Sequence, residues 1–145
     1  MLIVSLPVQA GMLTDGALGV AGSVGLALWA AGVVFETTGD LQLARFKRDP
    51  ANRDKVMDRG LWRYTRHPNY FGDFCVWWGF YLIALTAATW WTAAGPLLMS
   101  FLLLRVSGVS LLEKDIGSRR PGYAEYVRRT NAFFPGKPKE VASSE

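Results

Sequence analysis

The sequence predicts an all-α integral membrane protein with about three transmembrane helices, the end of a preceding one, and a cytoplasmic loop and tail. Half of the 145 residues are hydrophobic, and residues 16–35 and 74–104 contain no Asp, Glu, Lys or Arg. About 20 apolar residues cross a bilayer as a helix, so the first run predicts one span. The second run is too long for one span and contains Gly95 and Pro96 near its middle. We therefore interpret it as two spans joined in a hairpin.

The basic residues predict the orientation of these spans. Every Lys and Arg lies at position 45 or later, and short loops rich in basic residues stay in the cytoplasm. Spans at about 16–37, 70–90 and 94–112 satisfy this rule when the 40–67 loop and the C-terminus are cytoplasmic. Residues 1–10 are similar to the last two turns of a span that begins before them. We expect the lipid bilayer to be the main partner.

Small residues in the first span predict close helix packing. Ala17, Ala21 and Gly25 recur at every fourth position and form a small-residue face on the expected helix. The helix is expected to continue past the bilayer and to end at the turn sequence that begins with Asp49 and Pro50.

Polar groups are expected to face one another where this helix meets the next one. Asp40 and Lys47 share a face of the extended first helix. His67 precedes a proline, which favours an extended backbone there and a helix start at the proline. Asn69 and Asp73 then lie one turn apart, at the level of the cytoplasmic headgroups.

These residues predict a polar pocket at the cytoplasmic mouth of the helix bundle. Cations could pair with phosphates, rings could stack on a flat base, and the amide and carboxylate could bind an amide or ribose hydroxyls. The candidates in these three groups are Lys47, Arg63, Arg66 and Arg105, then Trp62 and Tyr64, then Asn69 and Asp73. This inventory fits a dinucleotide with an extra phosphate. It also fits S-adenosylmethionine, which needs fewer cations.

Other kinds of site are poorly supported. The chain has one histidine, His67, and one cysteine, Cys75, so neither a His-His pair nor a thiolate metal site is available. We predict no metal. No Gly-x-Gly-x-x-Gly or Walker-type motif is present, which excludes the soluble nucleotide-binding folds. The orientation rule already accounts for the basic loop, so we expect no nucleic-acid partner.

Several motifs in order along the chain resemble the membrane steroid 5-alpha-reductase and sterol-reductase superfamily, in particular its bacterial DUF1295 branch. The longest runs from Gly60 to Asp73, and shorter ones lie at 35–40, 46–53, 112–114 and 119–130. The resemblance covers residues 1–136. It implies a C-terminal membrane domain that lacks the N-terminal spans, a polar tail at 137–145, and a location in the bacterial inner membrane.

The resemblance also implies an activity: NADPH-dependent reduction of a carbon–carbon double bond in a lipophilic, steroid- or isoprenoid-like enone. The residues at cofactor-contacting positions of the family are Asp40, Lys47, Trp62, Asn69, Asp73, Arg105 and Tyr126. The acid that polarises the substrate carbonyl lies on earlier spans of the family. The catalytic residues of this chain are therefore unknown. Tyr64 and His67 are conceivable substitutes for the acid, but His67 is expected instead to orient the turn or to bind a phosphate of the cofactor.

Two alternatives remain open. The pattern Arg66-His-Pro-x-Tyr70 also occurs in isoprenylcysteine carboxyl methyltransferases, which use S-adenosylmethionine. Those enzymes typically carry paired glutamates after the last span, whereas this chain has Glu113 and Lys114 there, which favours the reductase. The other alternative is an inactive membrane fragment with a structural role.

Overall fold

The computed structural model describes residues 2–12, 18–86, 88–107 and 122–139 of the chain. The helical elements in these ranges are α1 (Leu6–Gly11), α2 (Val20–Arg48), η1 (Pro50–Asn52), η2 (Gly60–Arg63), α3 (Pro68–Ala84), η3 (Trp90–Ala93), α4 (Ala94–Phe101), η4 (Leu102–Ser107) and α6 (Tyr123–Arg129). All regular elements within these ranges are helical, which confirms the predicted all-α class.

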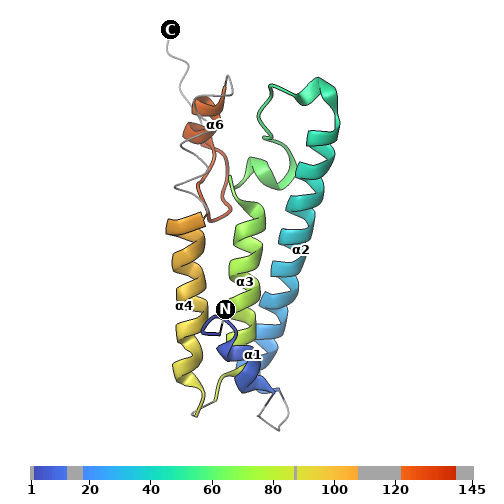
Figure 1. Ribbon diagram of the computed structural model, residues 1–145. Coiled ribbons are helices and arrows are strands. Elements are labelled where there is room, and N and C mark those ends of the chain that lie inside the picture. The colour runs from blue at the N-terminus through green and yellow to red at the C-terminus, as the bar shows by residue number, and fades with distance from the viewer. Residues whose placement is uncertain (1, 13–17, 87, 108–121, 140–145) are drawn as a thin grey trace.

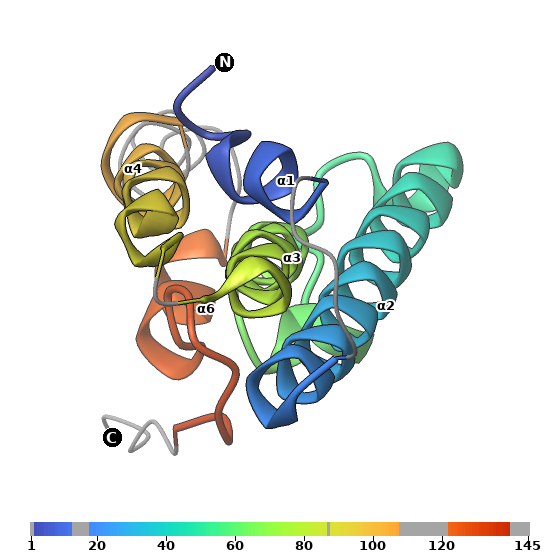
Figure 2. The same ribbon diagram turned by 90° about the horizontal axis from the view of Figure 1, so that it is seen from below.

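Three helices define the long axis of the molecule. α2, α3 and α4 run side by side, α1 packs near one end, and α6 lies at the other end (Figure 1). Seen along this axis, α3 occupies the centre, with α2 and α4 on either side of it (Figure 2). The two ends of the bundle therefore consist of different elements. One end carries α1 and short turns, and the other carries α6 and the loop after α2.

α2 is the long helix that the sequence predicts. It continues past residue 37 and stops at Asp49, which has an extended backbone and precedes Pro50, as the turn chemistry predicted. Among the described residues, α2 is the one helix long and apolar enough to cross a membrane. α3 lies inside the predicted span 70–90 except for its first two residues. The combined α4–η4 segment lies inside the predicted span 94–112, of which residues 108–112 are outside the described ranges. The number of spans stays a prediction.

Glycines bring α2 and α3 into direct backbone contact. Gly25 and Gly32 lie two helical turns apart on α2, and both are buried. A Cβ atom added to Gly32 would lie 2.6 Å from the carbonyl oxygen of Gly72 on α3. One added to Gly25 would lie 2.8 Å from the carbonyl oxygen of Gly79. Side chains larger than glycine therefore do not fit at this interface.

The predicted small-residue face was wrong in its spacing. Ala21 is exposed, Gly25 is buried, and Ala17 lies outside the described residues. The observed interface uses every seventh residue, and Gly39, the next position after Gly32, packs against the start of α3. Where two helices pack at a small crossing angle, the contact positions on each helix recur about every seventh residue, which is two turns.

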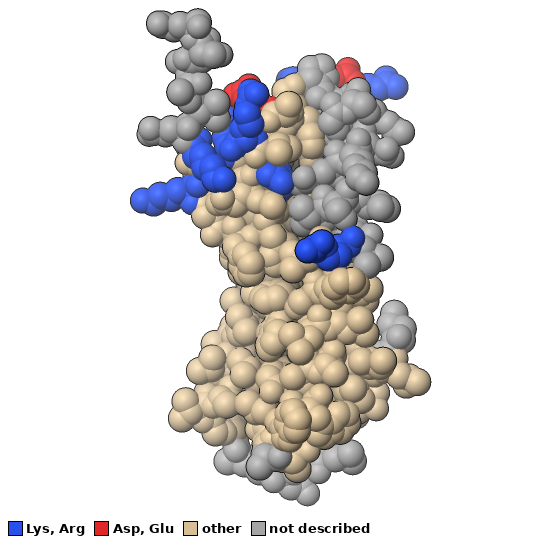
Figure 3. All heavy atoms as spheres, turned by 90° about the vertical axis from the view of Figure 1, so that its left-hand side faces the viewer, with Lys and Arg blue, Asp and Glu red and all other residues tan. Residues whose placement is uncertain are grey.

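Charge is concentrated at one end of the molecule. In the face shown in Figure 3, lysine, arginine and acidic side chains gather in the upper part, and most of the lower part shows none among the residues described. The described residues from 2 to 35 and from 74 to 104 carry no ionisable acid or base of these four types. The charged end is the one that carries α6, η2 and the end of α2.

Candidate functional site

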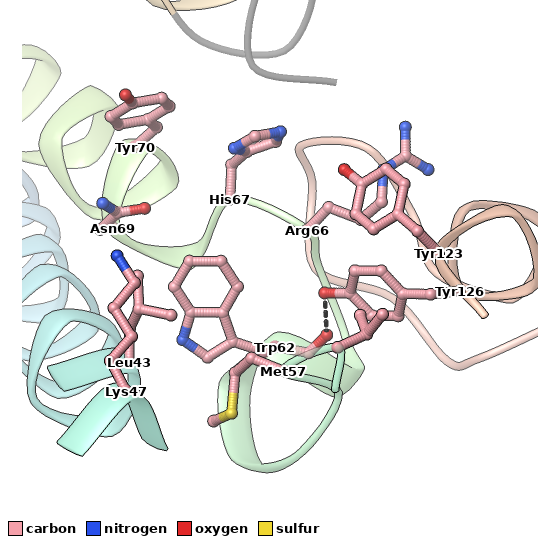
Figure 4. Close-up of a pocket in the computed structure, with 11 residues that line it drawn as sticks. Leu43, Lys47, Met57, Trp62, Arg66, His67, Asn69, Tyr70, Tyr123 and Tyr126 are labelled. Carbon is pink, nitrogen blue, oxygen red and sulfur yellow. Dashed lines mark hydrogen bonds between the residues drawn. The ribbon is translucent and has the colours of Figure 1, made fainter. Parts of the chain in front are cut away.

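A cavity of about 330 Å³ lies at the charged end, between the last turns of α2, the first turn of α3, and α6. Figure 4 shows the side chains that surround it. The cavity is lined by Leu43, Lys47, Val56, Met57, Trp62, Arg66, His67, Asn69, Tyr70, Tyr123 and Tyr126. Segments far apart in the sequence therefore meet in one pocket, and aromatic rings form much of its wall.

The ring of Trp62 is held in place by α2. Its indole Nε1 donates a hydrogen bond of 3.0 Å to the carbonyl oxygen of Gly39, and the side chain is buried. The short helix η2 that carries it starts at Gly60, whose φ of +58° favours glycine. The backbone N–H of Leu61 donates to the side-chain oxygen of Gln42, at 3.0 Å. The indole is thus a fixed wall with its polar atom already satisfied.

The opposite wall is α6, and Tyr126 fastens it to η2. The Tyr126 hydroxyl donates a hydrogen bond of 2.6 Å to the carbonyl oxygen of Trp62 (Figure 4). Burial, followed by the influence of Tyr123, raises the pKa of the Tyr126 phenol well above its ordinary value. The phenol therefore stays protonated and continues to donate this bond. Tyr123, one turn earlier on α6, is also buried and lines the cavity.

Arg66 holds the C-terminal end of α6. One terminal nitrogen of its guanidinium donates to the carbonyl oxygens of Val127, at 3.0 Å, and Thr130, at 2.8 Å. Its backbone N–H donates to the carbonyl oxygen of Asn131, at 2.9 Å. The last carbonyls of a helix lack partners within the helix, and a basic side chain is a favourable cap for them. Arg66 therefore fixes the C-terminal end of α6, the helix that forms this wall of the pocket.

The segment after α6 is also hydrogen-bonded to the residues that follow η2. The buried hydroxyl of Thr65 donates to the carbonyl oxygen of Phe133 at 2.7 Å, and the Gly136 N–H donates to the Tyr64 carbonyl oxygen at 3.1 Å. The ring of Phe133 packs edge-on against Phe71 and Phe74 of α3. Residues 64–66 are thus hydrogen-bonded to the C-terminal segment.

The first turn of α3 supplies the remaining polar wall. Pro68 occupies the first helical position, as the sequence predicted. The rings of His67 and Tyr70 are stacked, with centroids 5.5 Å apart. Lys47 and Asn69 reach the cavity from the same side, next to Trp62 (Figure 4). An ammonium group and an amide thus lie beside an aromatic wall.

A comparison with protein-family models supports the DUF1295 part of the resemblance found in the sequence. The family model described as "Protein of unknown function (DUF1295)" matches residues 1–130. The chain belongs to the DUF1295 family. No curated protein and no solved structure matches it.

The structure of this DUF1295 member brings together only part of the predicted site. Of the predicted residues, those that line the cavity are Lys47, Trp62, Arg66, His67, Asn69 and Tyr126. Arg63 lines a separate hollow, and the side chains of Asp40 and Tyr64 are exposed. Asp73 is partly buried on α3 and does not line the cavity, and Arg105 lies on η4 with its side chain exposed.

Sequence reasoning missed several lining residues. Tyr70 and Tyr123 stand inside the motifs that carry the resemblance, and Leu43 shares the helix face of Lys47. Those signals could have identified them. Val56 and Met57 lie in an irregular loop and had no periodic signal. Within the described ranges, no group of three or more His, Cys, Asp or Glu side chains is placed to hold a metal ion.

Proposed function

We propose that this DUF1295 chain is the cofactor-binding part of a membrane-embedded, NADPH-dependent reductase. Its substrate class is a lipophilic enone, steroid- or isoprenoid-like, whose carbon–carbon double bond is reduced. The observation that carries the proposal is the aromatic cavity with Lys47 and Asn69 on one side, at the charged end of an apolar helix bundle. A polar cofactor and a lipid-soluble substrate can meet at such a place.

The membrane part of the proposal rests on α2 and on the distribution of charge. α2 is long and apolar enough to cross a bilayer, and the basic residues gather at one end of the bundle. Basic residues favour the cytoplasmic side. The cavity then opens at the cytoplasmic surface, where NADPH is available.

The lining residues suit one half of a dinucleotide. The indole of Trp62 offers a fixed face for a flat ring, since its N–H is already bonded to Gly39. Lys47 supplies a cation for a phosphate, and Asn69 supplies an amide that can donate and accept. A cavity of about 330 Å³ lies at the lower end of the usual range for ligand pockets. It accommodates a nucleoside with its phosphate, and the rest of the cofactor would extend beyond it.

Bound NADPH would supply a hydride for the electron-poor carbon of the substrate. The role of this chain is then to bind and orient the cofactor. Tyr126 is an unsuitable proton donor because its hydroxyl already donates to the Trp62 carbonyl. Tyr64 lies outside the cavity, whereas His67 lines it. No residue is assigned the role of the acid.

The test compares two adjacent cations on α2. NADPH, NADH and S-adenosylmethionine are titrated into the detergent-purified chain by calorimetry, with the variants Lys47→Gln and Arg48→Gln. Lys47 lines the cavity, and Arg48 is an exposed neighbour outside its lining. We expect Lys47→Gln to weaken NADPH binding about tenfold or more, because a hydrogen bond to a charged group contributes about 1.5–3 kcal/mol. Arg48→Gln should change it less than about twofold.

The response to NADH indicates what Lys47 contacts. If its ammonium binds the extra phosphate, Lys47→Gln removes the preference for NADPH and leaves NADH binding nearly unchanged. Saturable binding of S-adenosylmethionine, with no response to either nicotinamide cofactor, would contradict the reductase and support the methyltransferase. Equal losses in the two variants would show that the cavity is not the cofactor site.

A further inference from the structure

A second hollow, of about 420 Å³, shares no lining residue with the cavity, although residues of η2 line both. It is lined by Asp58, Arg59, Gly60, Arg63, Arg129, Thr130 and Pro138. Three separate parts of the chain therefore form it: the loop with η2, the end of α6, and the C-terminal segment. Arg63, which the sequence predicts to contact the cofactor, lines this hollow instead of the cavity.

The hollow carries an excess of positive charge. Arg129 forms an ion pair with Asp58. Within the described part of the chain, the guanidinium groups of Arg59 and Arg63 pair with no carboxylate. Three arginines and one acid therefore line this hollow, while Asp54 and Glu125 line a neighbouring one together with Arg59 and Arg129. Guanidinium groups suit phosphate, which they can bind through two parallel hydrogen bonds.

The walls of the hollow are fixed by backbone hydrogen bonds. The Lys139 N–H donates to the Arg129 carbonyl oxygen at 2.8 Å, which holds the C-terminal segment against α6. The Trp62 N–H donates to the Arg59 carbonyl oxygen at 3.1 Å, within the turn that carries Arg63. The backbone that carries the three arginines is thus pre-arranged, so an anion would have to order their side chains but little of the main chain.

The surroundings favour a lipid headgroup over a nucleotide. None of the described residues that line this hollow is aromatic, so a base would find no aromatic ring to stack on. Tyr64, which follows Arg63, is 44% exposed, and Phe134 on the C-terminal segment is 61% exposed. Exposed aromatic rings beside basic residues are typical of the headgroup level of a membrane.

We propose that Arg59, Arg63 and Arg129 bind the headgroup phosphate of an anionic phospholipid from the cytoplasmic leaflet. The proposal rests on the membrane location in the proposed function, and it is independent of the cofactor. The bound lipid would fix the charged end of the bundle, and with it the pocket walls on η2 and α6, at the membrane surface.

The test measures lipid retention by the detergent-solubilised chain, with no nicotinamide cofactor present. Phosphatidylglycerol or phosphatidylcholine with the same acyl chains is added, and bound lipid is counted by native mass spectrometry. The variant is Arg59→Gln/Arg63→Gln. The matched control is Arg45→Gln/Arg48→Gln, which removes the same charge from exposed positions at the same end of the molecule. Thermal unfolding in the same detergent checks that all the variants are folded.

We expect one phosphatidylglycerol to be retained in preference to phosphatidylcholine. A hydrogen bond from a charged group to the phosphate contributes about tenfold or more in affinity, so loss of two guanidinium contacts should weaken retention more than about tenfold. The control should lose less than about twofold. Equal losses in the two variants, or equal retention of the two lipids, would overturn the proposal. Displacement of the lipid by millimolar glycerol phosphate would also overturn it, because the site would then be one for soluble phosphates. A failure here leaves the NADPH titrations of Lys47→Gln unaffected, so the two proposals fail separately.

Discussion

The hydroxyl of Tyr126 lies 2.6 Å from the carbonyl oxygen of Trp62 and donates a hydrogen bond to it. This bond joins α6 to η2 across 64 positions of the sequence. On the other side, the indole of Trp62 is bonded to Gly39 of α2. The backbone carbonyl of Trp62 therefore holds α6, and its indole is bonded to α2. Loss of either hydrogen bond should change the shape of the cavity.

Replacement of Tyr126 by Phe should destabilise the protein by about 1–3 kcal/mol, because it leaves the Trp62 carbonyl without its buried partner. The free energy of unfolding is measured by chemical denaturation in detergent micelles. Tyr81→Phe is the control, since its hydroxyl makes an exposed, 3.4 Å contact with the Trp90 carbonyl oxygen. It should change stability by less than about 0.5 kcal/mol. Equal effects of the two substitutions would argue against the Tyr126 bond.

The advantage of wild type over Tyr126→Phe should shrink in alkali. Burial raises the pKa of the Tyr126 phenol in the folded state. The unfolded chain ionises near the ordinary pKa of about 10, while the folded chain keeps its proton. Stability from this group is therefore complete below pH 10 and is lost as the pH rises above it. The difference between the two proteins should fall by about 1 kcal/mol between pH 10 and pH 11. A constant difference over this interval would show that the phenol ionises equally in both states.

Substitution of Arg66 should loosen α6 before it affects the cofactor directly. Arg66→Lys keeps the charge but has a shorter side chain, so its ammonium does not replace the guanidinium nitrogen that donates to both the Val127 and Thr130 carbonyls. Hydrogen exchange of the backbone amides in α6 should become about tenfold faster, whereas the exposed substitution Arg63→Lys should leave it unchanged. Loss of NADPH binding in Arg66→Lys with normal exchange in α6 would instead identify Arg66 as a direct cofactor ligand.

An added methyl group should be tolerated at one glycine of α2 and not at another. Gly32→Ala places a Cβ 2.6 Å from the Gly72 carbonyl oxygen, a backbone atom that cannot move without shifting α3. We expect a loss of about 1–3 kcal/mol, or failure to fold. In Gly22→Ala, the new Cβ meets only the flexible side chain of Leu18. That change should be neutral or stabilising by up to about 1 kcal/mol, because alanine favours the helix. Denaturation in detergent compares the two, and equal tolerance would show that α2 and α3 do not meet at Gly32.

The sequence by itself determined the long helices of this protein. Charge-free runs, the turn at Asp49 and the proline after His67 predicted the positions of α2 and α3. These signals are local, since they depend on residues within a few turns of one another. The motif from Gly60 to Asp73 likewise indicated the family, which the match over residues 1–130 confirmed.

Only the tertiary structure decided which side chains meet. Arg66 and Arg63 look alike in the sequence, but one caps α6 while the other faces the hollow that we assign to phosphate. Tyr126 and Trp62 come together because the C-terminal segment folds back along residues 64–66. Such contacts depend on chain segments more than 60 positions apart, and no periodic pattern encodes them. The physical reason is that helix propensity and hydropathy depend on residues close together in the sequence. A pocket, in contrast, is formed by packing between side chains that are far apart in the sequence.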